Sequence, residues 1–170
     1  MMRNKLAKTI NKLNVLPAGI KGFLITKIFC SKVKYAGTTG IRIEQLTESK
    51  AVVRLTNRKK VQNHIGSIHA VAAAVLAEST TGMVFGMNVP DTCIPLLKSM
   101  RIDYQRRMQG NLKAIALLNQ DQRDSINHIE KGELVVPVEI FDETDQQPIV
   151  CTMEWAWVPK RKTEAVKESR

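Results

Sequence analysis

The chain has 170 residues, of which 44% are hydrophobic and 5% are aromatic. This length and composition predict one globular domain that can bury its own core, and no run of about 18 apolar residues indicates a transmembrane helix. The formal net charge of +10 is concentrated at the two ends, because residues 44–158 carry twelve basic and fourteen acidic residues. A nearly neutral body excludes a nucleic-acid-binding surface over the whole fold. Three widely separated cysteines predict reduced thiols, a cytoplasmic location and no metal site.

Residues 1–35 are basic and contain no acidic residue. Apolar residues recur at helical spacing on both sides of Pro17 and Gly19, which predicts two short amphipathic helices. We expect these helices to pack against the rest of the domain. Two alternatives are a mitochondrial presequence and peripheral contact with an anionic membrane surface. The lysines suited to such a membrane contact are Lys5, Lys8, Lys12, Lys21 and Lys27.

The body of the chain, residues 36–158, alternates between apolar and polar residues along much of its length, and residues 159–170 form a charged tail. Strands are predicted at 40–46, 51–57, 97–105, 112–118, 134–140 and 149–158. One long helix is predicted from Ser67 to Met83, residues 120–131 are predicted to be a polar connection, and no helix is predicted after residue 85. These elements define an α+β fold in which a curved antiparallel sheet wraps around one long central helix.

The predicted central helix contains one unusual residue. Its sequence is rich in Ala, Val and Leu on every side, which predicts burial, yet Glu78 lies within it. An ionisable carboxylate in such a place is costly unless it is paired or used, and burial should raise its pKa. Asn63 and His69 precede the run of Ala, Val and Leu in this helix. These three residues are therefore the first candidates for catalysis, with a paired structural carboxylate as the alternative for Glu78.

The pattern Asn63-x-x-Gly66-x-x-His69, followed by an acid nine positions after the histidine, resembles the hotdog-fold acyl-CoA thioesterases. The similarity covers residues 36–158 and includes the phenylacetyl-CoA thioesterases and a less characterised hotdog subfamily. It implies that Glu78 acts as general base or nucleophile, that Asn63 positions the water or the carbonyl, and that His69 orients the thioester. The backbone N–H of Ala70 would polarise the carbonyl. Many members of the family have His-Gly-Gly where this chain has His69-Ala70-Val71, and Val71 narrows the approach of a ligand.

Helix geometry limits how these residues work together. Nine helical residues turn through about 900° and rise by about 13.5 Å, so His69 and Glu78 of one chain do not address the same carbonyl. A working site would therefore combine Asn63 and His69 of one subunit with Glu78 of another. The resemblance implies the same arrangement, in a homodimer or a homotetramer.

Two other functions are compatible with the sequence. One is a non-catalytic module that binds an acyl group without cleaving it. The other is a hydroxyacyl thioester dehydratase that uses His64 and Glu78, although the Pro-Gly-rich segment of such enzymes is missing between them. For an acyl-CoA substrate, two basic groups are candidates for the coenzyme A phosphates, and no cofactor is predicted. These residues are Arg58, Lys59, Lys60, Arg106 and Arg107.

Overall fold

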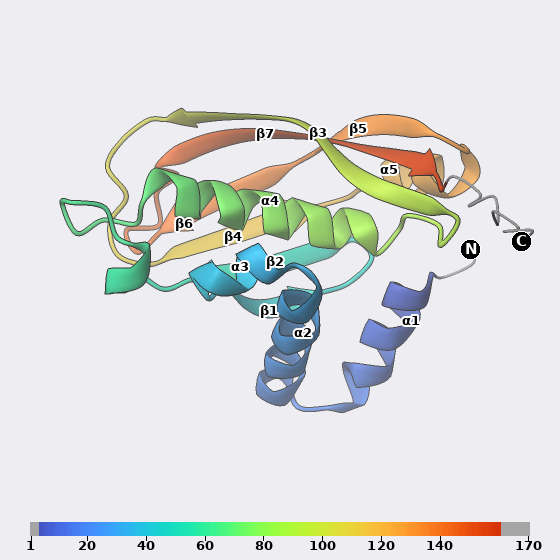
Figure 1. The fold of residues 1–170 in the computed structure, drawn as a ribbon, viewed down its shortest axis with the longest axis horizontal. Coiled ribbons are helices and arrows are strands. Elements are labelled where there is room, and N and C mark those ends of the chain that lie inside the picture. Colours follow the sequence, from blue (N-terminus) through green and yellow to red (C-terminus); the bar gives the residue numbers. More distant parts are fainter. Residues whose placement is uncertain (1–3, 161–170) are drawn as a thin grey trace, which may run out of the picture.

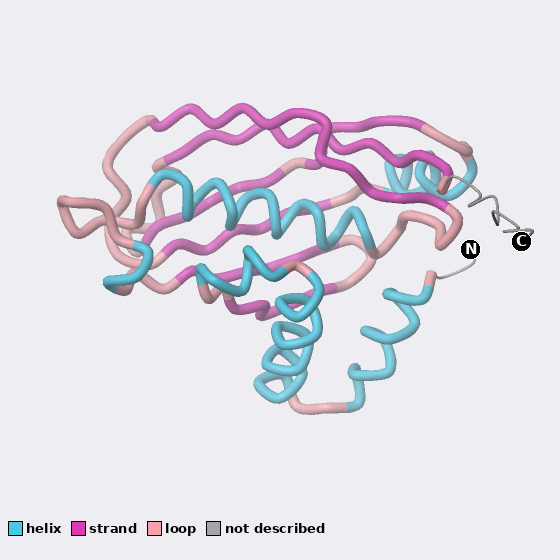
Figure 2. The backbone as a smooth tube through the Cα atoms, in the orientation of Figure 1, coloured by secondary structure: helices cyan, strands magenta, loops and turns pink. Residues whose placement is uncertain are grey.

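The computed structural model describes residues 4–160, in which two antiparallel sheets curve around one long helix (Figure 1). This helix, α4 (Ala70–Gly86), contacts strands of both sheets. Four strands pair in the order β1 (Arg42–Leu46), β2 (Lys50–Leu55), β4 (Leu112–Leu117) and β6 (Val138–Asp142). Three more pair in the order β3 (Cys93–Tyr104), β7 (Ile149–Pro159) and β5 (Gly132–Val136). Figure 2 shows α4 running along the length of these strands.

The helix α4 is buried because small residues let it lie close to the sheet. Ala73, Leu76, Ala77 and Val84 have no exposed surface. At its far end Phe85 packs against both tryptophans of β7, with ring centroids 5.6 Å and 6.1 Å away. The prediction of a buried central helix is confirmed, although the helix begins and ends three residues later than predicted.

The predicted strand at 134–140 is in fact two strands. Residues before Pro137 pair with β7, whereas residues after it pair with β4. Proline has no N–H to contribute to a ladder, so the pairing is interrupted there and the chain passes from one ladder to the other. Alternation of apolar residues continues through the break, which is why the pattern alone predicted one strand.

The prediction that no helix follows residue 85 is wrong. Residues 120–128 form α5 (Gln120–His128), which begins with a capping box between Asn119 and Gln122. Only Ile126 of this helix is buried. A single buried position gives almost no apolar periodicity, so the segment has the composition of a polar loop.

The N-terminal segment forms helices that pack on the body. Helix α1 (Lys5–Lys12) is capped by Asn4, whose buried side chain also donates to the carbonyls of Gly86 and Val89 at 2.8 Å and 2.6 Å. Helix α2 (Ala18–Lys32) crosses β1, where Gly22 meets the backbone of Ile43. These contacts confirm the prediction of packing against the domain.

Three shorter elements complete the described chain. They are η1 (Leu13–Val15), α3 (Lys34–Thr39) and η2 (Lys59–Val61). Gly40, predicted to open a strand, instead ends α3 in the left-handed conformation with φ of 67°. Within residues 4–160, every helix is too short or too polar to cross a membrane. The predicted tail begins with the end of β7 and Lys160, and its remainder lies outside the described residues.

Candidate active site

Glu78 lies on α4 at the wall of an apolar cavity of about 370 Å³. Apolar residues of α1 and α2, together with Lys32, form the opposite wall, and Pro95 of β3 and Trp155 of β7 also line the cavity. Among residues 4–160, the Glu78 carboxylate makes no hydrogen bond or ion pair. Burial in these surroundings raises the pKa of Glu78 above its ordinary value. The carboxylate is therefore half-buried and unpaired, in a cavity open to a ligand.

His69 caps the N-terminal end of the same helix. Its Nδ1 accepts a hydrogen bond from the N–H of Val71 at 3.1 Å, so the proton of the neutral ring is assigned to Nε2. The side chain is exposed and lines a second cavity, of about 390 Å³, together with Lys60, Gln62 and Tyr35. His69 thus offers an Nε2–H donor at the N-terminus of α4.

The first turn of α4 also has a free backbone donor. The N–H of Ala70 has no partner in the described part of the chain, while its carbonyl accepts a hydrogen bond from Tyr104 Oη at 2.9 Å. This bond ties the end of β3 to the start of α4, and sequence reasoning missed it. A free N–H at a helix N-terminus can bind a carbonyl oxygen that becomes negatively charged.

Asn63 shapes the loop before α4. Its Oδ1 accepts hydrogen bonds from the N–H groups of Ile65 and Ser67, both at 3.1 Å, and Gly66 completes the turn with φ of 78°. The amide oxygen is thus used within the loop. The Nδ2 donors have no partner within the described residues.

Within one chain the candidate residues are not brought to one place. Glu78 lines the cavity between α4 and the helices α1 and α2, whereas His69 lines the separate cavity beside α3. Helix geometry predicted this separation, because nine residues turn through about 900° and rise by about 13.5 Å along the axis. His64 is exposed in the loop between the strands and α4.

Three of the five basic candidates are engaged in internal contacts. Arg58 donates to the carbonyl of Thr39 at 2.9 Å. Arg107 donates to Ser67 Oγ at 2.9 Å and to the carbonyl of Ile65 at 2.8 Å. Lys59 and Lys60 are exposed, and neither side chain has a partner within residues 4–160. The lysine pair is therefore better suited than Arg58 and Arg107 to meet a phosphate group.

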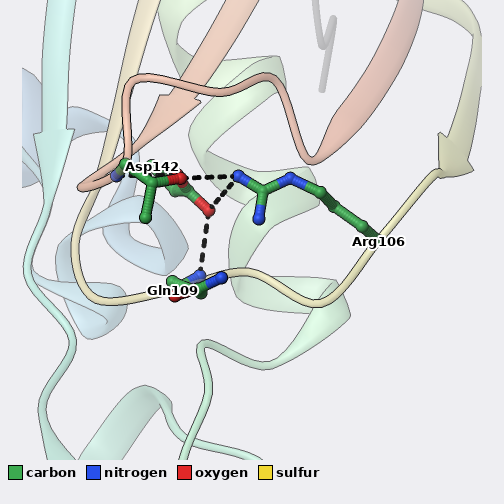
Figure 3. A network of polar contacts seen from close by, with 4 residues as sticks. Arg106, Gln109 and Asp142 are labelled. Carbon is green, nitrogen blue, oxygen red and sulfur yellow. Dashed lines mark hydrogen bonds and ion pairs between the residues drawn. The ribbon is translucent and has the colours of Figure 1, made fainter.

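Arg106 forms an ion pair with Asp142 at 2.8 Å (Figure 3). The Asp142 side chain is fully buried, and it also accepts hydrogen bonds from the N–H groups of Gln109 at 3.1 Å and Thr144 at 2.9 Å. Burial alone would raise the pKa of Asp142, but the bonds from Thr144 and Gln109 and the charge of Arg106 lower it below its ordinary value. Arg106 thus links the loop after β3 to the turn after β6, and this ion pair occupies its guanidinium group.

The described residues contain no cluster of His, Cys, Asp or Glu side chains that could hold a metal ion. The three cysteines are free thiols, and burial raises the pKa of Cys151 to about 11, which makes it a poor nucleophile. The chemistry available at the site is therefore that of a carboxylate, an imidazole and backbone donors.

The antiparallel strands curved around one central helix form a hotdog fold, as the sequence predicted. The chain belongs to the family defined by a domain of unknown function, DUF4442, whose model matches residues 22–158. No curated protein matches the chain.

Several solved structures share this fold. A probable thioesterase of unknown function from Pseudomonas aeruginosa has 21% identity and a TM-score of 0.72, over 85% of this chain and 97% of that chain. A thioesterase from Haemophilus influenzae has 14% identity and a TM-score of 0.66, over 82% and 92%. A variant thioesterase from Staphylococcus aureus has 20% identity and a TM-score of 0.63, over 74% and 99%.

Proposed function

We propose that the protein hydrolyses acyl thioesters such as acyl-CoA, with Glu78 as the general base. The Glu78 carboxylate takes a proton from water while the water oxygen attacks the thioester carbon. The carbonyl oxygen, which becomes negative, is held by the Ala70 N–H and the His69 Nε2–H of a second copy of the chain. The C–S bond then breaks, the thiolate takes the proton from Glu78, and a carboxylic acid and a free thiol are released.

The observation that carries this proposal is the unpaired carboxylate of Glu78 in an apolar cavity. A carboxylate that served only the fold of one protomer would have a cationic or hydrogen-bonding partner within residues 4–160, because burying an unpaired carboxylate even in part is costly. A raised pKa also makes the carboxylate a stronger base than a solvated one. A spacing adds support: Asn63 and Glu78 are fifteen positions apart, as are the Gln and the Glu replaced in two variants of the Staphylococcus aureus protein.

The test is an assay of thiol release from acyl-CoA by the wild-type protein and a Glu78→Gln variant. A protein that binds acyl-CoA without releasing thiol would be a binding module. Hydration of an enoyl-CoA, lost on replacement of His64, would indicate the dehydratase instead.

The complete site needs a second copy of the chain in this proposal. Strand β3 is twelve residues long, lies at the end of its sheet and has one edge unpaired in the described protomer. Such an edge is a template for pairing with another chain. Met100 supports this, since it pairs with the buried Met153 and shares its face of the sheet, yet its side chain is 54% exposed. Pairing of two β3 strands would cover Met100 and bring Glu78 towards the partner's helix N-terminus.

We expect Met100→Lys to convert a homodimer into a monomer and to abolish hydrolysis, because a charge would be placed in the covered interface. Sedimentation velocity and the thiol-release assay measure the two effects. Leu117→Lys, at an exposed apolar position on β4, is the matched control and should remain dimeric and active. A fully active monomer would refute the shared site.

The outer side of the N-terminal helices has the chemistry of a membrane-contact surface. Val15, Ile20 and Phe23 are 87%, 53% and 55% exposed, and α1 and α2 project from one side of the body (Figure 1). No acidic residue occurs in the first 43 positions to offset the lysines. Apolar side chains flanked by lysines suit an anionic lipid surface.

We expect the double variant Ile20→Glu and Phe23→Glu to lose at least ten-fold in binding to vesicles of phosphatidylserine and phosphatidylcholine, measured by co-sedimentation. Ile129→Glu, at an apolar position with 52% exposure outside these helices, should bind as the wild type does. Wild-type binding that does not weaken with added salt, or that needs no phosphatidylserine, would contradict the lysine contribution.

A further inference from the structure

The apolar cavity beside Glu78 is built largely by the N-terminal helices. Leu6 and Ile10 of α1 and Ile25, Ile28 and Phe29 of α2 form its wall opposite α4. From this wall we infer that the cavity is the binding site for a straight aliphatic acyl chain, and that α1 and α2 set the length of chain it accepts. The inference rests on the proposed function for the position of the thioester and extends it to the class of acyl group.

The direction of the cavity follows α4. Glu78, Gly82 and Gly86 lie along one side of the helix and all line the cavity. Eight helical residues separate the first from the last, a rise of about 12 Å. A thioester carbonyl near Glu78 therefore places the end of an extended acyl chain towards Gly86, beside Leu6 of α1.

The shape of the lining selects a narrow chain. At Gly82, a Cβ atom would lie 2.6 Å from the ring of Trp155, so the glycine lets the helix and the tryptophan meet closely. Trp155 is fixed there, because its Nε1 donates to Thr81 Oγ1 at 3.0 Å. At Gly86, by contrast, a Cβ atom would meet only Leu6 Cδ2 at 3.7 Å, an ordinary contact. The middle of the cavity is therefore bounded by a fixed tryptophan. At the far end, a side chain can be added at Gly86 without a clash.

The position of α1 is determined by polar contacts that do not reach into the cavity. Asn4 donates to Gly86 O and Val89 O, and the N–H of Lys5 donates to both carboxylate oxygens of Asp91 at 3.2 Å and 3.1 Å. Leu6 and Ile10 are therefore presented to the cavity by a helix that is tied to the end of α4. Helix α1 therefore has a fixed position, and it limits the length of the acyl chain that the cavity accepts.

The inference is tested with a series of S-alkyl thioethers of coenzyme A, from butyl to hexadecyl, which bind but cannot be hydrolysed. We expect calorimetry on the wild-type protein to show affinity rising about four-fold for each added methylene group until the chain reaches the end of the cavity. Gly86→Leu fills that end, so it should weaken binding of dodecyl and longer chains at least ten-fold and leave butyl binding unchanged. Leu6→Ala enlarges the same end and should move the affinity plateau to longer chains.

Gly19→Leu is the matched control, because a Cβ atom at Gly19 meets no atom within 4 Å and Gly19 does not line the cavity. It should reproduce the wild-type series. An affinity that is independent of chain length, or equal losses for all chains in Gly86→Leu and none in Leu6→Ala, would overturn the inference. Binding that depends on the length of the alkyl group, with no thiol release from the matching acyl-CoA, would support the cavity assignment and refute the proposed hydrolysis.

Discussion

Glu78→Gln is expected to lower kcat for acyl-CoA hydrolysis by about a hundred- to ten-thousand-fold, because glutamine fills the same space but cannot accept a proton from water. The fold should not suffer, since the wild-type carboxylate has no partner among residues 4–160. Thiol release measures the activity, and thermal unfolding measures the stability. Glu130→Gln makes the same chemical change at an exposed site and should be fully active. A Glu78→Gln variant with normal turnover would remove Glu78 from the reaction.

The same residue gives the protein a defined pH dependence. Burial raises the pKa of Glu78, so the carboxylate becomes protonated at a higher pH than a solvated glutamate. Activity should therefore decline as the pH falls through this raised pKa, because only the ionised form is a base. The contribution of Glu78 to the free energy of unfolding changes with pH in the opposite direction to the activity. The folded state binds the proton more tightly than the unfolded state, so this contribution decreases as the pH rises from the unfolded pKa to the folded pKa.

Asp142→Asn is expected to reduce the free energy of unfolding by about 3 kcal/mol, because Arg106 loses its counter-ion and the N–H groups of Gln109 and Thr144 lose a charged acceptor. Chemical denaturation measures this change. Asp145→Asn is the control in the same turn, where the side chain is exposed and asparagine tolerates the φ of 54°.

The pH dependence of this contribution distinguishes an ionic role from simple packing. The pKa of Asp142 is lowered in the folded state, so its stabilisation is present above the unfolded pKa and is lost as the pH falls through the folded pKa. The difference in stability between wild type and Asp142→Asn should therefore shrink in acid. A difference that stays constant down to acid pH would show that the negative charge does not stabilise the fold.

Local patterns were sufficient for the elements that are apolar on one face or on all faces. Apolar residues recur about every two positions in β2, β4 and β7, and small or apolar residues continue through α4 on both sides of Glu78. The burial of each segment can therefore be predicted from its own sequence. Helix α5 and the break at Pro137 have no such local signature. The first buries only Ile126, and the second changes the partner strand without changing the alternation.

The same distinction between local and long-range information applies to the residues of the candidate site. The sequence by itself singled out Glu78, because a carboxylate inside an apolar helix is costly whatever surrounds it, and helical phase alone separated it from His69. Only the tertiary structure decided that Glu78 meets a cavity walled by α1 and α2, that Arg106 is used by Asp142, and that Tyr104 is bonded to the start of α4. The physical reason is that these contacts join residues more than thirty positions apart. Such pairs are selected by the packing of whole elements, which leaves no periodic trace in either segment.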